Sequence, residues 1–294
     1  MKRLIVNGDD LGLTRGVNAG ILRAFKEGVL TSTTLMANGD AFDGAVELAL
    51  ANPRLGVGCH LAVVGGRPVS PPRSIPTLVD GDGMLPATFS HLMIKTYGAL
   101  RDEDVEREFR AQIERVIASG ITPTHLDTHK HSHTLPRIMK VLARLAQDFA
   151  IRCVREPFES ILAVNTIGPS ARTKRRLYLK QYALSAAVAV HAVRFRRIAR
   201  EYRLRTPEHF RGVRLTGMLD SEAVCGLIET LPEGTTELMC HPGMCDPELE
   251  RMPTRLKRER EIEVDTLTDP TVRRCIDERN VGLISYREIA REYV

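Results

Sequence analysis

The stretch THLDTHKHSH brings together four of the chain's nine histidines and one aspartate. Side chains alternate between the two faces of a β-strand, so a strand here sends His125, Asp127 and His129 to one face. That face can provide one metal ligand, with Asp127 as a carboxylate that orients it. We expect His131 and His133 to lie in the following turn and to line a loop or pocket. A solvated, fortuitous histidine tract is the alternative.

Three further segments carry residues of the same chemical types. The adjacent Asp9 and Asp10 in NGDDLG point in different directions, so one can bind a cation while the other accepts a proton. A turn or a helix cap is the alternative. His60 in VGCHLAV is either a ligand or a histidine of the apolar core. His241 in LMCHPG can donate a proton to a leaving group, although CHPG also suits a simple strand end and turn.

One carboxylate and two imidazoles form a metal site that keeps positions open for water and substrate. This ligand set suits Zn²⁺ or a similar first-row ion better than Mg²⁺, which prefers oxygen ligands, although Mg²⁺ or another divalent ion remains an alternative. Such an ion lowers the pKa of a water molecule and polarises a carbonyl group. The residues therefore indicate a metal-dependent hydrolase with one divalent ion.

Short apolar runs alternate with longer amphipathic segments along the chain, which predicts an α/β fold with a parallel sheet, open or closed into a barrel. In such folds the chemistry lies at the carboxyl ends of the strands. The candidate residues fall at these ends, with Asp9 and Asp10 directly after the first strand. We expect strands at 3–7, 31–38, 55–64, 124–129, 151–155, 212–217, 235–241 and 281–286, and helices at 17–29, 41–52, 102–120, 138–149 and 220–230.

The composition is that of an ordinary globular protein, with 294 residues, 43% hydrophobic and 27% charged. The absence of Trp argues against a stacking platform for single-stranded nucleic acid. The six cysteines have no paired spacing except in CHPGMC at 240–245, and the start lacks a signal-peptide core. Both features indicate free thiols and a cytoplasmic protein. The longest apolar run, 182–193, is too short to span a bilayer.

Two segments interrupt the regular alternation. Residues 66–90 begin with a Pro- and Gly-rich stretch and are expected to form a loop insertion over the strand ends. Residues 171–205 are expected to be helical and contain eleven Lys and Arg but one acidic residue, Glu201. This segment is either an ordinary helix with solvated ends or a helix that lies on the anionic inner face of a membrane. Nucleic acid is not expected, because no binding motif accompanies the charge.

The sequence resembles the YdjC-type carbohydrate deacetylases over nearly its whole length. The matching stretches are LIVNGDDLGLTRGVNAGI, LTSTTLMANG, VGCHLAV, PTHLDTHKHSHTLP, VREP and ELMCHPG. The resemblance implies one domain, 1–294, with a distorted TIM-like (β/α) barrel of fewer than eight parallel strands. It also implies that Asp10, His60 and His129 bind the divalent metal.

The resemblance assigns catalytic roles as well. By analogy with the wider polysaccharide deacetylases, Asp9 is the general base, His241 is the acid, and Arg155 in VREP holds the base by its charge. His125, Asp127 and His131 remain as residues that support the ligands or line the substrate pocket. Leu11 and Lys130 depart from the Phe and His that many relatives carry there, which alters the pocket but removes no ligand.

The segment VGGRPVSPPRSIPTLVDGDGMLP is most similar to the hopanoid-biosynthesis-associated branch of that family. This similarity implies removal of acetate from an N-acetylglucosaminyl group on a lipid-linked bacteriohopanoid. Deacetylation of soluble chitooligosaccharides such as N,N'-diacetylchitobiose is the alternative, since those enzymes share the metal motifs. Another metallohydrolase, such as a phosphoesterase, and a non-catalytic metal- or membrane-binding protein are the remaining alternatives.

Overall fold

The structure is a computed structural model that describes residues 1–160 and 167–291. Its strands are β1 (Lys2–Leu11), β2 (Ser32–Leu35), β3 (Gly56–Leu61), β4 (Leu126–Thr128), β5 (His209–Arg211), β6 (Gly234–Cys240) and β7 (Gly282–Leu283). The helices are α1 (Arg15–Glu27), α2 (Phe42–Ala51), α3 (Phe89–Tyr97), α4 (Asp102–Ala118), α5 (Pro136–Asp148), α6 (Pro169–Thr173), α7 (Arg175–Val188), α8 (Ala192–Glu201), α9 (Ser221–Glu229), α10 (Pro247–Arg251), α11 (Glu259–Thr268), α12 (Pro270–Glu278) and α13 (Tyr286–Arg291). Short 3₁₀ turns are η1 (Pro72–Ser74), η2 (His129–Thr134), η3 (Ala189–His191) and η4 (Val213–Leu215).

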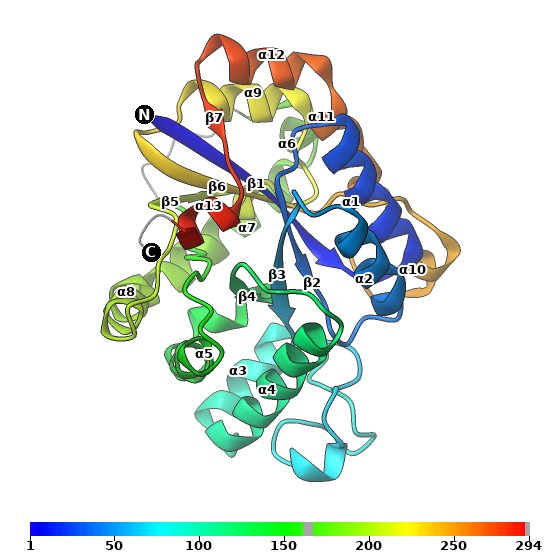
Figure 1. The fold of residues 1–294 in the computed structure, drawn as a ribbon, viewed down its shortest axis with the longest axis vertical. Coiled ribbons are helices and arrows are strands. Elements are labelled where there is room, and N and C mark those ends of the chain that lie inside the picture. The colour runs from blue at the N-terminus through cyan, green and yellow to red at the C-terminus, as the bar shows by residue number, and fades with distance from the viewer. Residues whose placement is uncertain (161–166, 292–294) are drawn as a thin grey trace.

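All strand pairs are parallel, and six strands follow the order β4-β3-β2-β1-β6-β5 while β7 pairs with the start of β1. The sheet curls, and helices surround it on all sides of the view, with α1 and α2 opposite α5 and α8 (Figure 1). Within the described ranges there are seven strands, so the predicted distorted barrel with fewer than eight parallel strands is confirmed. Parallel order places every strand's carboxyl end at one edge of the sheet.

Three expected strand positions are wrong. β1 continues to Leu11, so Asp9 and Asp10 lie inside the strand instead of after it. The segment 151–155 forms only two isolated bridges, Leu126 with Val154 and Cys153 with Arg205. The expected strand 212–217 is the 3₁₀ turn η4, because Gly212 turns the chain with a φ of 115° and the short β5 precedes it.

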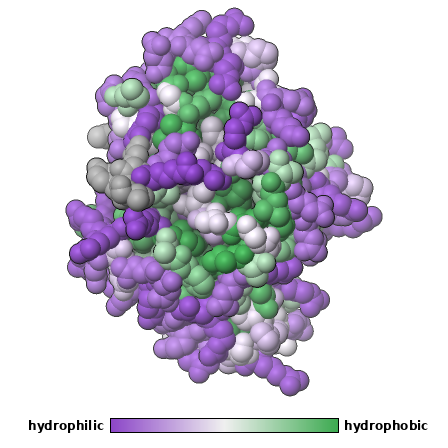
Figure 2. Space-filling model, viewed as in Figure 1, coloured by the Kyte–Doolittle hydropathy of each residue, from purple (hydrophilic) through white to green (hydrophobic). Residues whose placement is uncertain are grey.

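Two apolar clusters hold the layers together. The larger fills the space between the sheet and the helices and includes Leu4 and Val6 of β1. The smaller contains Ile5, Cys153, Tyr286 and Ile289 and lies on the opposite face of β1, because successive side chains of a strand alternate. In the space-filling view hydrophilic side chains dominate the rim of the molecule, while hydrophobic ones gather near the middle of the face (Figure 2).

Local sequence signals set several helix starts. The Thr14 hydroxyl accepts a hydrogen bond from the Val17 N–H at the start of α1, and Asp220 caps α9 in the same way. Proline occupies the first position of α5 and α12, where its missing N–H costs nothing. These capped helices fix the chain segments that follow the strands.

The cysteine expectation needs one correction. Cys225 of α9 and Cys275 of α12 are joined by a disulfide, so not all six cysteines are free thiols. Cys59, Cys153, Cys240 and Cys245 are free. In the ranges 1–160 and 167–291, no helix combines the length and the apolar character needed to cross a membrane.

Candidate active site

A break in the strand geometry directs both adjacent aspartates into one site. The pairing of β1 with β2 shifts register between Gly8 and Leu11, and Asp10 adopts a left-handed backbone with a φ of 72°. Aspartate tolerates this conformation better than most residues, at a cost of about 1–3 kcal/mol. The irregularity therefore cancels the alternation that would send neighbouring side chains to opposite faces.

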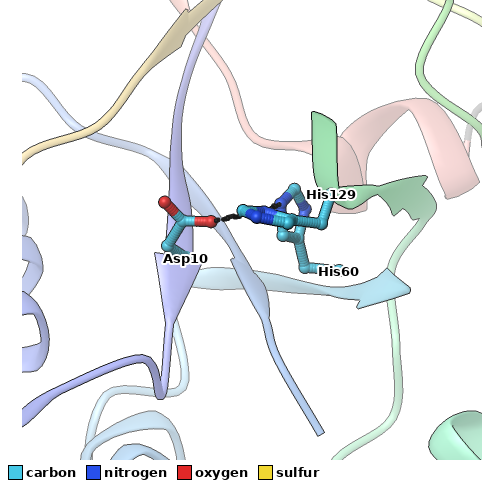
Figure 3. Close-up of side chains that lie close together, drawn as sticks. All are labelled: Asp10, His60 and His129. Atoms are coloured by element: carbon cyan, nitrogen blue, oxygen red, sulfur yellow. Dashed lines mark hydrogen bonds and ion pairs between the residues drawn. The ribbon is translucent and has the colours of Figure 1, made fainter. Parts of the chain in front are cut away.

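Asp10, His60 and His129 converge at the carboxyl ends of β1, β3 and β4 (Figure 3). His129 Nδ1 lies 3.1 Å from Asp10 Oδ1 and 3.3 Å from His60 Nε2, and His60 Nε2 lies 3.3 Å from Asp10 Oδ1. Three donors at these separations match the ligands of one ion at about 2.0–2.2 Å from each. The two imidazole nitrogens and one carboxylate oxygen fit a first-row divalent ion. The side chain of His129 is 21% exposed while the others are nearly closed to solvent, so the cluster opens on the side of His129.

Asp127 fixes the orientation of His60. Its Oδ1 lies 2.7 Å from His60 Nδ1, so Nδ1 carries the proton and Nε2 faces the cluster. Burial lowers the pKa of His60, but Asp127, Asp10 and Asp9 outweigh this effect and raise the pKa to about 10. The surrounding negative charge thus favours a cation at this position.

A second group, Asp9, His60 and Asp127, is also close enough to share an ion. Its carboxylates are already engaged by the fully buried guanidinium of Arg155. Arg155 bonds both oxygens of Asp9 at 2.7 and 2.8 Å and lies 2.5 Å from Asp127 Oδ2. The charge of these two carboxylates is therefore already balanced by Arg155, and the Asp10 cluster is the better metal site.

The environment of Asp9 keeps it ionised. Burial raises the pKa of Asp9, but the charge and hydrogen bonds of Arg155 outweigh burial and hold the pKa well below its usual range. Asn7 Nδ2 donates a further hydrogen bond to Asp9 Oδ1 at 3.0 Å. The Asp9 side chain is therefore ionised at all ordinary pH values.

His241 lies directly after β6, where its imidazole is mostly shielded from solvent. Its backbone N–H donates to Glu263 of α11, which fixes the turn, whereas Nδ1 has no partner in the described chain. Burial lowers the pKa of His241 to about 4, and the neighbouring Asp9 and Asp10 counteract only part of that effect. At neutral pH the imidazole is neutral, with one nitrogen free to exchange a proton.

The other histidines of THLDTHKHSH have different surroundings. His125 is fully buried and stacks on Tyr286 with ring centroids 3.6 Å apart. His131 is partly exposed and packs edge-on against Phe210, with the centroids 5.9 Å apart. Lys130 and His131 both have a left-handed backbone, which turns the chain sharply after His129.

His133 supports the backbone of Arg155. It is fully buried, and its Nε2 donates to the backbone carbonyl of Arg155 at 3.0 Å, so its Nδ1 accepts from the Thr128 hydroxyl at 2.6 Å. Burial lowers the pKa of His133 to about 3, which keeps the ring neutral for this role.

Several site residues carried no sequence signal. Arg260 of α11 donates to Asp10 Oδ2 at 2.5 Å and holds the proposed ligand from the side opposite the histidines. Glu237 of β6 bonds Arg155 at 2.7 Å and accepts from the Tyr286 hydroxyl at 2.5 Å. The contacts join residues 49 to 250 positions apart along the chain, which only an evolutionary or structural comparison could have revealed.

The segment 66–90 borders the opening of the cluster. A Cβ atom at Gly65, directly before this segment, would lie 4.0 Å from the His129 ring, and Lys130 Nζ donates to the Ala87 carbonyl at 3.1 Å. The loop is pinned to α4 by Glu108, which accepts the N–H groups of Val69 and Ser70 at 2.8 Å each. It is therefore an ordered wall of the site.

Comparisons with known proteins match nearly the whole chain. A family model described as YdjC-like protein matches residues 3–278. A carbohydrate deacetylase from Geobacillus stearothermophilus is 36% identical over 285 residues, which cover 97% of this chain and 96% of the relative. A chitooligosaccharide deacetylase from Salmonella typhimurium is 31% identical over 287 residues, with 97% and 98% covered. The crystal structure of a proposed cellobiose-phosphate cleavage protein from Enterococcus faecalis has a TM-score of 0.77 at 27% identity and covers 98% of both chains.

Proposed function

The chain belongs to the YdjC-like family, and from this premise we propose that it is a metal-dependent deacetylase that removes acetate from an N-acetylglucosaminyl group. Relatives of nearly the same length are named carbohydrate deacetylases. The observation that carries the proposal is the convergence of Asp10, His60 and His129 beside Asp9 and His241. Hydrolysis of an amide requires a metal ion with open coordination positions and two groups that transfer protons.

Asp10, His60 and His129 are the residues that would hold the ion. A divalent ion bound there supplies Lewis-acid polarisation of a carbonyl and lowers the pKa of a water molecule. Asp127 and Arg260 keep two of these ligands oriented, through His60 Nδ1 and Asp10 Oδ2. The ligand chemistry favours Zn²⁺, with Mg²⁺ or another divalent ion as the alternative.

The chain's own residues would move the protons. Asp9, held ionised by Arg155, accepts a proton from the attacking water while the water oxygen forms a bond to the acetyl carbonyl carbon. The neutral His241 imidazole takes up that proton from Asp9 and passes it to the amine nitrogen as the C–N bond breaks. The products are acetate and a free amino sugar, so atoms and charges balance. His125 stacks on Tyr286, whose hydroxyl bonds Glu237, a partner of Arg155. His133 bonds the backbone carbonyl of Arg155.

For the substrate we propose a lipid-linked bacteriohopanoid glycoside, which would place the protein in the cytoplasm at the inner face of the membrane. The proposal is supported by the similarity of residues 64–86 to the hopanoid-associated branch and by the position of Gly65, at the start of that loop, beside His129. Soluble chitooligosaccharides are the second candidate, because one full-length relative is named a chitooligosaccharide deacetylase.

Mass spectrometry of reaction products tests both levels of the proposal. The zinc-loaded protein is incubated with N,N'-diacetylchitobiose and with N-acetylglucosaminyl bacteriohopanoid, and loss of one acetyl group is measured for each. Loss from the lipid-linked substrate at the higher kcat/KM supports the proposed substrate. A higher kcat/KM for N,N'-diacetylchitobiose would favour soluble chitooligosaccharides as the substrate. Absence of acetate release from both substrates would contradict the deacetylase function.

A further inference from the structure

The segment 171–205 leaves an unusual apolar surface uncovered. Of the fourteen residues of α7 only Ser185 is buried, although the helix is rich in Leu, Ala and Tyr. Leu179 and Leu184 of α7 are 54% and 56% exposed, and Val190 and Val193, which follow in η3 and α8, are 75% and 76% exposed. In the described chain these are four of the twelve large hydrophobic side chains that are exposed. One helical unit therefore carries a third of the large apolar side chains that are exposed in the described ranges.

Positive charge borders this apolar surface at both ends. Arg175, Arg176 and Lys180 lie at its start, and Arg194, Arg197 and Arg200 follow it. Within the ranges that the structure describes, none of the six forms an ion pair. The neighbouring Arg172, Lys174 and Arg196 are paired with Glu222, Glu259 and Glu156. The only acidic residue of the segment is Glu201. We call these six cations and the four apolar side chains the α7–α8 face.

The α7–α8 face lies at the same edge of the sheet as the proposed active site. α7 packs on the turn η4, which directly follows β5 at its carboxyl end. Gln181 Nε2 donates to the Thr216 carbonyl at 2.9 Å, and the Arg214 guanidinium lies over the Tyr182 ring at 4.6 Å. A surface that contacts α7 would thus lie near the sheet edge at which the cluster of Asp10, His60 and His129 opens to solvent.

We propose that the α7–α8 face docks on an anionic lipid bilayer, with its aliphatic side chains at the acyl boundary and its arginines and lysine at the headgroups. Aliphatic side chains flanked by cations match a surface that is apolar below and negatively charged above. Nucleic acid would use the charge but gain nothing from exposed Leu and Val. A second copy of the chain would place six cations against six cations across a two-fold interface, which opposes association. The inference depends on the surface residues and stands apart from the proposed deacetylase activity.

Vesicle co-sedimentation of the full chain tests the proposal. The vesicles are phosphatidylcholine alone and phosphatidylcholine with phosphatidylglycerol, at low and high salt. We expect binding to the anionic vesicles that salt weakens. Arg194→Glu with Arg197→Glu should lower the partition coefficient at least about tenfold, and Val190→Ser with Val193→Ser should lower it several-fold. These four side chains are exposed, so the variants should fold.

Matched controls separate the face from general charge and hydrophobicity. Lys26→Glu with Arg274→Glu changes two exposed cations on α1 and α12, and Ile94→Ser with Tyr97→Ser changes two exposed apolar residues on α3. Equal losses in the controls, or equal binding to neutral vesicles, would overturn the proposal. Binding of the protein to DNA but not to vesicles would also overturn it. So would a dimer in solution that is lost only in the variant Val190→Ser with Val193→Ser. Turnover of a soluble N-acetylated sugar should be unchanged in the docking variants, so loss of docking and loss of the deacetylase function are separate results.

Discussion

Asp127 Oδ1 lies 2.7 Å from His60 Nδ1, while Arg155 lies 2.5 Å from the other oxygen of the same carboxylate. One buried carboxylate therefore connects the orientation of a proposed metal ligand with the guanidinium that holds the proposed base. Thr34 also approaches His60 Nδ1, at 3.1 Å. The protonation of His60 and the position of Asp9 are coupled through these contacts.

Asp127→Asn should weaken metal binding by about 10- to 100-fold. The new amide must present its oxygen to Arg155, so its NH₂ group faces His60 Nδ1 and forces the proton onto Nε2, which faces the cluster. Zinc affinity measured by competition with a chelator checks this result. Thr34→Val is the matched control, because it removes a polar neighbour of His60 and leaves Asp127 in place. Wild-type affinity in Asp127→Asn would contradict the orienting role.

Asp9→Asn should retain the metal and lose turnover by at least about 100-fold, because the amide still bonds Arg155 but cannot accept a proton from water. Acetate release and metal content are measured on the same preparation. Asp10→Asn is the companion variant and should lose metal as well as activity. An Asp9→Asn protein with full metal and an unchanged rate rules out the base assignment.

Arg155→Gln should lower the free energy of unfolding by about 3–5 kcal/mol or prevent folding, because three buried carboxylates lose their common cation. Asp9, Asp127 and Glu237 all form ion pairs with this guanidinium, and all three are buried. Arg144→Gln removes an ion pair with Glu106 at a site that is 49% exposed and should cost less than about 1 kcal/mol. Urea denaturation compares the two. Similar small losses in both variants would show that the Arg155 network is not structurally important.

The sequence predicted the parallel fold and the strand ends that carry chemistry, because apolar runs and helical spacing are local signals. It failed where tertiary pairing overrides local preference. Asp9 and Asp10 resemble a turn, yet β1 continues through them because Leu11 pairs with Leu35 of β2. Residues 212–217 resemble a strand, but Gly212 starts a turn and the pairing with β6 uses residues 209–211.

The candidate site was predictable only in part. Strand alternation predicted that Asp127 orients a ligand of its own segment, whereas the structure places it beside His60 of β3. His129 reaches the cluster from η2, where alternation no longer applies. Arg260 and Glu237 reach the site from α11 and β6, and each is one charged residue among many in the sequence. Their roles depend on distances between remote segments, which spacing along one chain does not encode.

Glu263 should make stability depend on pH. Burial raises its pKa to about 7 from 4.5, against the hydrogen bond from the His241 N–H and the charge of Arg260. The folded protein therefore keeps a proton that the unfolded chain releases, so the stabilising contribution is complete below pH 4.5 and is lost as the pH rises through 7. Relative to Glu263→Gln, the wild type should lose up to roughly 3 kcal/mol between these limits. Urea unfolding of both proteins from pH 5 to 8 measures the difference. Glu229→Gln, at a site that is 55% exposed, should show no such trend, and a flat difference for Glu263→Gln would mean that Glu263 is ionised throughout.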